Sequence, residues 1–96
     1  MIRVRVCSAA EAEYANALCW YAERSVDVAL DFESEFEAVL VKIAESPDRY
    51  PACDSRHRYV LMRRFPYQII FRPVADSNTI IAVAHTSREP GYWSHR

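Results

Sequence analysis

The densest group of side chains capable of chemistry lies in the last twelve residues, from 85 to 96. His85 could act as a general acid or base near neutral pH. Arg88 could hold a phosphate and stabilise charge that develops during phosphoryl transfer. Tyr92 could donate a proton or stack on a base, and Trp93 could stack likewise. This segment begins where a buried strand is expected to end, so these side chains would emerge from a rigid support.

Each of these residues also has a structural explanation. His85 could hydrogen-bond to the backbone at the strand end, and Tyr92 with Trp93 could cover the core as a C-terminal plug. No serine or cysteine beside a histidine makes a convincing nucleophile, and no spacing of His, Cys, Asp and Glu is typical of a metal site. We therefore expect no cofactor, and any strand cleavage would have to be metal-free.

Length and composition predict a single domain spanning residues 1–96. The chain is 51% hydrophobic and 12% aromatic, which excludes a disordered protein. Gly91 is the only glycine, so glycine-rich phosphate-binding loops are excluded. No apolar run reaches the length of a membrane span, so we expect a cytoplasmic protein with no membrane partner.

Three cysteines occur at positions 7, 19 and 53, an odd number with no CxxC spacing. This pattern favours reduced thiols that act as small core residues over a disulfide or a zinc site.

The net charge of −1 hides a strong segregation along the chain. Residues 1–48 carry ten acids and four bases, a net charge of −6, whereas residues 49–96 carry eight bases and three acids, a net charge of +5. Eleven of the twelve basic residues are arginines, which suit bidentate contact with phosphate or carboxylate. The chain should therefore present a basic surface to a polyanion or an acidic partner. The candidates for this contact are Arg63, Arg64, Gln68, Arg72, Trp93 and Arg96.

Two helices are expected in the first half. Ser8 and Glu11 form a capping-box pattern, so the first helix should start near Ala9 and end near Arg24. Its apolar stripe consists of Ala10, Tyr14, Ala17, Leu18 and Tyr21, and we expect Trp20 and Tyr21 to pack between helix and sheet.

The second helix should be capped by Ser25 or Asp27 and should stop before Pro47. The residues of its expected core face are Ala29, Phe32, Phe36, Val39, Leu40 and Ile43. The acids Asp31, Glu33, Glu35 and Glu37 should form a solvated face.

Four strands complete the expected fold. Residues 2–6 alternate between apolar and basic side chains, and three later runs have strand character: 59–65, 67–71 and 79–84. Arg63 and Arg64, adjacent on one such run, should point to opposite faces. The fold class is therefore α+β with the order β-α-α-β-β-β, a helical hairpin packed on a four-stranded, mostly antiparallel sheet.

At this point the chain resembles the RelE/ParE superfamily of toxins from type II toxin–antitoxin systems, and within it the ParE-like plasmid-stabilisation proteins. The resemblance covers nearly the whole chain. It is carried by Trp20-Tyr21, Phe32, Pro47, Tyr50-Pro51, Arg64-Phe65-Pro66-Tyr67, Ala82-Val83-Ala84-His85 and Arg88-Glu89-Pro90-Gly91-Tyr92-Trp93.

The resemblance implies a small growth inhibitor that is neutralised by a cognate antitoxin. Such antitoxins fold a largely disordered segment around the toxin, burying apolar anchors and pairing acids with the arginine-rich face. The family divides by target: RelE-like members cut mRNA within the ribosome without a metal, and ParE-like members poison DNA gyrase.

The residues of the nuclease members are only partly matched. Arg88 and Tyr92 match an arginine and an aromatic residue near the C-terminus, and His85 resembles a histidine that some nucleases use. Gln68 stands where an arginine is expected, and Tyr59 and Leu61 stand where lysines are expected. The loss of these cations favours a ParE-like toxin that acts on gyrase over a ribosome-dependent endoribonuclease. A third alternative is a non-toxic, antitoxin-binding module of the same fold.

Overall fold

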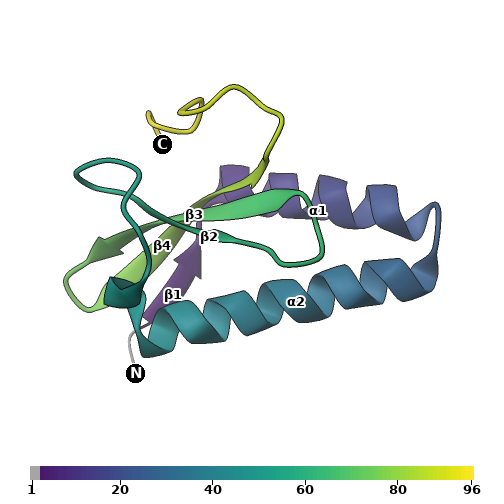
Figure 1. Cartoon of the computed structure of the whole chain (residues 1–96), viewed down its shortest axis with the longest axis horizontal. Coiled ribbons are helices and arrows are strands. Elements are labelled where there is room, and N and C mark those ends of the chain that lie inside the picture. Colours follow the sequence, from purple (N-terminus) through teal and green to yellow (C-terminus); the bar gives the residue numbers. More distant parts are fainter. Residues whose placement is uncertain (1–2) are drawn as a thin grey trace.

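The computed structural model describes residues 3–96 and has two helices and a four-stranded sheet (Figure 1). The elements in chain order are β1 (Arg3–Val6), α1 (Ser8–Ala22), α2 (Val26–Glu45), the short 3₁₀ helix η1 (Pro47–Arg49), β2 (Arg58–Leu61), β3 (Tyr67–Val74) and β4 (Ser77–His85). The predicted order β-α-α-β-β-β and the α+β class are confirmed.

The helices begin and end for different local reasons. The side-chain oxygen of Ser25 accepts a hydrogen bond from the N–H of Val28, so Ser25 caps α2, and the helix ends at Glu45, before Pro47, as predicted. The predicted capping box of Ser8 and Glu11 is wrong. The cap of α1 is Cys7, whose side chain makes no capping hydrogen bond, while its carbonyl accepts from the N–H of Glu11.

The sheet has the strand order β1-β4-β3-β2. β4 pairs antiparallel with β3 and β3 antiparallel with β2, whereas β1 pairs parallel with β4. The sheet is therefore mixed, with one parallel pair at its edge, because the helical hairpin forms the crossover between β1 and the other strands.

One predicted strand is too long. The run 59–65 forms a strand only to Leu61, and the chain then bends. The backbone N–H groups of Arg63 and Arg64 are bound by the carboxylate of Glu35 on α2, so they are not available to a strand partner. Arg63 and Arg64 thus do not lie on opposite faces of a strand, and Glu35, predicted to be solvated, holds the bend against the helix.

Apolar side chains pack on both faces of the sheet. On one face, the predicted stripes of α1 and α2 meet Ile69, Phe71, Ile80 and Val83 in the main core. On the opposite, helix-free face, the C-terminal segment covers a smaller cluster of Ile70, Ile81, Ala82 and Ala84 with Trp93. In Figure 1 this segment lies on the far side of the sheet from α2.

Two expectations about burial are wrong. All three cysteines are free thiols, but Cys19 and Cys53 are exposed, and only the half-buried Cys7 packs against the main core. Trp20 is 52% exposed and lies under the guanidinium of Arg24, 3.6 Å from the ring centroid, whereas Tyr21 packs inward on Phe32 and Phe65. Neither described helix is both long and apolar enough to cross a membrane.

Candidate functional site

A groove of about 500 Å³ opens between α1 and the ends of β3 and β4. Its floor and walls are largely aromatic and apolar, and its ionisable groups include one acid, one histidine and one arginine. The lining residues are Glu13, Asn16, Ala17, Trp20, Tyr21, Pro66, Tyr67, Val83, His85 and Arg88. Two of the three residues proposed for catalysis, His85 and Arg88, therefore share this groove.

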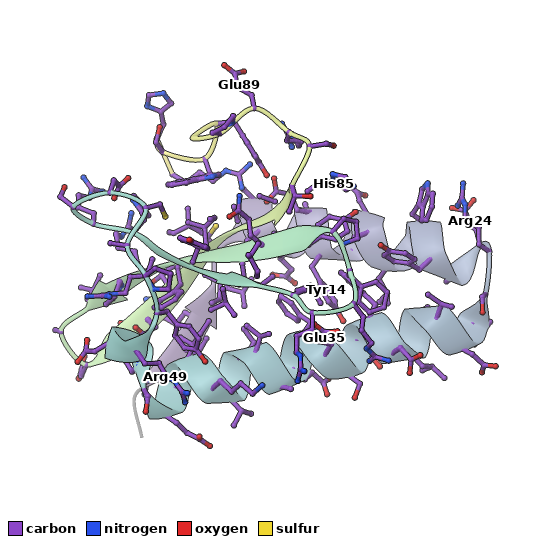
Figure 2. The ribbon with its side chains drawn as sticks, viewed as in Figure 1. Tyr14, Arg24, Glu35, Arg49, His85 and Glu89 are labelled. Atoms are coloured by element: carbon purple, nitrogen blue, oxygen red, sulfur yellow. The ribbon has the colours of Figure 1, made fainter. Side chains whose placement is uncertain are left out.

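His85 is the last residue of β4 and stands beside α1 (Figure 2). Its ring lies edge-on to Tyr67, with the centroids 5.1 Å apart. The N–H of Ser87 donates to Nδ1 over 3.1 Å, and the Ser87 hydroxyl lies 2.7 Å from the same nitrogen. Since Nδ1 accepts from the backbone, its ring proton resides on Nε2 in this geometry. The structural explanation for His85, a backbone contact at a strand end, is thus present.

Glu13, in the middle of α1, binds the basic and phenolic groups of the C-terminal segment. Its carboxylate accepts hydrogen bonds from the Tyr92 hydroxyl at 2.6 Å and from the Arg96 guanidinium at 2.8 and 3.1 Å. It also accepts the backbone N–H of Val83 at 3.0 Å, and Arg88 lies 3.6 Å away. One carboxylate therefore ties the helix, the free edge of β4 and the C-terminal segment together.

These contacts shift the protonation of the groups involved. Burial raises the pKa of the Glu13 carboxyl, but the hydrogen bonds from Arg96, Tyr92 and Val83 outweigh burial and hold this pKa below its ordinary value. Burial and the hydrogen bond to Glu13 raise the pKa of Tyr92 to about 12. At neutral pH Glu13 is thus ionised and Tyr92 keeps its proton.

Arg88 keeps part of its surface free. Its guanidinium stacks on the Tyr92 ring, 3.7 Å from the centroid, and its side chain is 55% exposed. A cation held by stacking at the rim of an aromatic groove can meet an acidic or phosphate group without reorganisation.

The positions that the sequence comparison set against the cations of nuclease members lie on the helix-free face of the sheet. Gln68 pairs across the sheet with Leu61 and Ala84, and Tyr59 pairs with Ile70 in the next row on the same face. The three positions compared with nuclease cations, Gln68, Tyr59 and Leu61, are therefore neighbours. Trp93, only 6% exposed, packs in the same cluster.

The family model of the ParE toxin of type II toxin–antitoxin systems, parDE, matches residues 4–90. The chain belongs to the ParE toxin family. Membership makes it the toxin component of a toxin–antitoxin system, whose partner is a cognate antitoxin.

A solved structure supports the same fold for this ParE-family toxin. A chain of the "Chromosomal ParDE TA system from P. aeruginosa" superposes with a TM-score of 0.78 at 14% sequence identity, covering 91% of this chain and 98% of that chain. No curated protein sequence matches the chain significantly.

In the ParE-family chain, the remaining predicted contact residues do not form one surface. Arg63 and Arg64 lie at the bend beside α2, where Arg64 also faces Asp31 at 3.6 Å. Arg72 lies on β3, where its guanidinium donates to the backbone carbonyl of Arg96. The Arg96 side chain turns instead to Glu13 and to the carbonyl of Ile81. The basic half of the sequence is thus spread over separate parts of the molecule.

Glu13 is the site residue that the sequence interpretation missed. A signal was available, because Glu13 falls between Ala10 and Ala17 on the stripe predicted to face the sheet. A charged residue in a buried stripe requires a partner, but its partners Tyr92 and Arg96 lie about eighty positions later in the sequence. Among residues 3–96, no cluster of His, Cys, Asp and Glu is suited to holding a metal ion.

Proposed function

We propose that this ParE-family toxin acts in the cytoplasm on DNA gyrase to stop growth, and that its antitoxin neutralises it by binding in the groove between α1 and β4. The proposal distinguishes the chain from ribosome-dependent nucleases of the same superfamily. One observation carries that distinction.

The observation is the neutral patch formed by Tyr59, Leu61 and Gln68 on the helix-free face. These positions are adjacent in the sheet, so three cations there would act together on one phosphate. Phosphoryl transfer without a metal depends on fixed positive charge at that point. Here Tyr59 and Gln68 can supply hydrogen bonds, Leu61 supplies none, and none of the three side chains carries a charge, which supports a toxin that does not cleave RNA.

The state of Tyr92 supports the same conclusion. Its hydroxyl donates to Glu13, and its pKa of about 12 lies far above the pH of a cell. A general acid or base works best when its pKa is near the working pH. Arg88 stacks on Tyr92 and lies near Glu13, while about half of its side chain stays exposed. Arg88 and Tyr92 are therefore better suited to binding a partner than to catalysis.

The groove has the features that a segment folding on binding requires. Trp20, Tyr21 and Tyr67 offer aromatic surface for apolar anchors, and Arg88 offers a cation for an acidic side chain. Antitoxin affinity should therefore fall when Arg88 is replaced by Glu and should depend on salt. Lys42→Glu on the exposed face of α2 is the matched control. Equal affinity for both variants at every salt concentration would rule out this groove as the binding site.

The target is tested by inducing the toxin alone and mapping the 5′ ends of a reporter mRNA, alongside gyrase supercoiling and DNA-cleavage assays with purified toxin. We expect intact message, growth arrest and trapped gyrase–DNA cleavage. New ends within the translated region that vanish with Arg88→Ala would instead identify a ribosome-dependent nuclease. Intact message without growth arrest would identify a non-toxic antitoxin-binding module.

A further inference from the structure

Parallel pairing of β1 with β4 brings arginines from both halves of the sequence onto one face of the sheet. Val4 and Val6 pack into the main core, so Arg3 and Arg5 point to the helix-free face. Arg5 pairs with Thr79, and Thr79 pairs with Arg72 of β3. Arg5 and Arg72 therefore occupy one row, two strands and about 10 Å apart.

A fourth arginine, Arg56, lies near Arg72 at the β2 edge of the sheet, opposite the β1 edge. Arg56, in the loop before β2, lines a hollow of about 460 Å³ together with Arg72. The carboxylate of Asp54 accepts the N–H groups of Arg56 and His57 and the ring Nδ1 of His57, which orders the loop. The loop is thus held in place at the end of the strip, and Asp54 is the one acid among the lining residues of this hollow. We name Arg3, Arg5, Arg56 and Arg72 the basic strip.

The side chains of the strip are largely free to bind. Within residues 3–96, the side chains of Arg3, Arg5 and Arg56 have no hydrogen bond or ion pair, and Arg72 uses one nitrogen on the Arg96 carbonyl. Asp76 is the acid beside Arg3 and Arg5 in a second hollow. The strip therefore carries a clear excess of positive charge on a protein whose net charge is −1.

The residues that line the two hollows of the basic strip indicate which kind of ligand fits it. The hollow at Arg3 and Arg5 is lined only by Arg3, Arg5, Asp76 and Ser77, so it offers no apolar anchor for a peptide that folds on binding. Neither this hollow nor the one at Arg56 has a Phe, Tyr or Trp in its lining on which unpaired bases could stack. A polyanion that needs neither anchors nor stacking is the backbone of a nucleic-acid duplex.

We propose that the basic strip binds the phosphodiester backbone of duplex DNA, independently of the groove at Glu13. The contact is to backbone and not to base edges, so it is not specific for sequence. This inference goes beyond the gyrase proposal and does not depend on it, because binding is measured with toxin and DNA alone.

The test is titration of a labelled short DNA duplex with the full chain, followed by fluorescence anisotropy over a series of salt concentrations. Four arginines on phosphates predict a slope of log affinity against log salt of about −3 to −4. The double variant R3Q/R5Q should bind more weakly and reduce that slope by about 2. Lys42→Gln, which removes one positive charge on the helix side, should leave both the affinity and the slope unchanged.

Three outcomes would overturn the inference. One is duplex binding that R3Q/R5Q leaves unchanged in affinity and slope. Another is equal, arginine-dependent binding of polyglutamate, which would make the strip a site for acidic protein. The last is tighter binding of single-stranded DNA or of duplex RNA than of duplex DNA. R3Q/R5Q changes two exposed side chains on an edge strand, so its circular dichroism spectrum should match that of the wild type and exclude misfolding as a cause.

Discussion

The groove at Glu13 and the basic strip lie on the same small sheet but are built in opposite ways. In the groove, every charged group is tied to another part of the chain: Glu13 binds Arg96 and Tyr92, and Arg88 stacks on Tyr92. On the strip, Arg3, Arg5 and Arg56 are exposed and have no protein partner within residues 3–96. The groove is a structural junction with a binding rim, whereas on the strip only Arg72 makes a side-chain hydrogen bond within residues 3–96.

This difference explains why arginine content alone is a poor guide to function in this protein. Arg96 and Arg88 share one carboxylate, and Arg64 faces Asp31 and Glu35, so much of the charge of the basic half is neutralised locally. Arg3 and Arg5, from the acidic half, supply free charge instead. The positive charge that remains unpaired in the folded protein is therefore not confined to the basic half of the sequence.

The largest effect should come from the main core. Phe36 is buried, and its ring lies 4.3 Å from that of Tyr14. Phe36→Ala should lower the free energy of unfolding by about 3–5 kcal/mol, because it removes a buried aromatic ring and leaves a cavity. Urea denaturation measures this loss, and the strip variant Arg5→Gln serves as the control. A Phe36→Ala protein of near-normal stability would contradict the assigned core face.

The next effect should come from Glu13→Gln, which removes the charge shared by Tyr92, Arg88 and Arg96. We expect a loss of about 1–3 kcal/mol in the free energy of unfolding at neutral pH, because the charged hydrogen bonds weaken. The folded pKa of Glu13 is lowered, so its contribution is complete above the ordinary carboxyl pKa and is lost as pH falls through the folded value.

Stability measured against pH sharpens this prediction. The wild type and Glu13→Gln should differ at pH 7 and converge in strong acid, where the Glu13 carboxyl is protonated. Parallel curves over the whole range would mean that the ionisation of Glu13 does not stabilise the junction.

A smaller effect on stability, but a large one on function, is expected for Arg88→Ala. The Arg88 side chain is 55% exposed and its contact with Glu13 is long. The free energy of unfolding should therefore change by about 1 kcal/mol or less. Toxicity and antitoxin affinity should fall much further than this change explains. If toxicity and melting temperature decline in proportion, Arg88 is a structural residue.

The smallest effect is expected for Arg5→Gln on the strip. An exposed side chain without a partner should change the free energy of unfolding by less than about 0.5 kcal/mol. Antitoxin affinity should also stay unchanged if the antitoxin occupies only the groove. An antitoxin that binds Arg5→Gln much more weakly would extend its binding site across the sheet and would remove the separation between the two regions.

Local patterns predicted most of the fold. The apolar stripe of α2, its Ser25 cap and its end before Pro47 follow from neighbouring residues, and all three are present. The errors involve partners distant in sequence. The bend after Leu61 depends on Glu35 of α2, and Trp20 is exposed, with its ring under Arg24 rather than packed against the sheet.

The candidate site was predicted in part. His85, Arg88, Tyr92 and Trp93 could be selected as a cluster because they are close in sequence. Their different contacts could not be predicted: Trp93 is buried in the cluster on the helix-free face, whereas Tyr92 packs against that cluster and turns its hydroxyl to Glu13. Glu13 itself was missed because its partners come from the other end of the chain.

The sequence by itself determined the helical hairpin, the four strands and the family, because periodicity, caps and motifs are properties of neighbouring residues. Only the tertiary structure decided which charges remain free. The pairing of a charge depends on the few ångströms that separate it from an opposite charge, and strand pairing sets those distances. Glu13 thereby neutralises the C-terminal arginine, while Arg3 and Arg5 share a row or its neighbour with Arg72 on the helix-free face and keep exposed side chains.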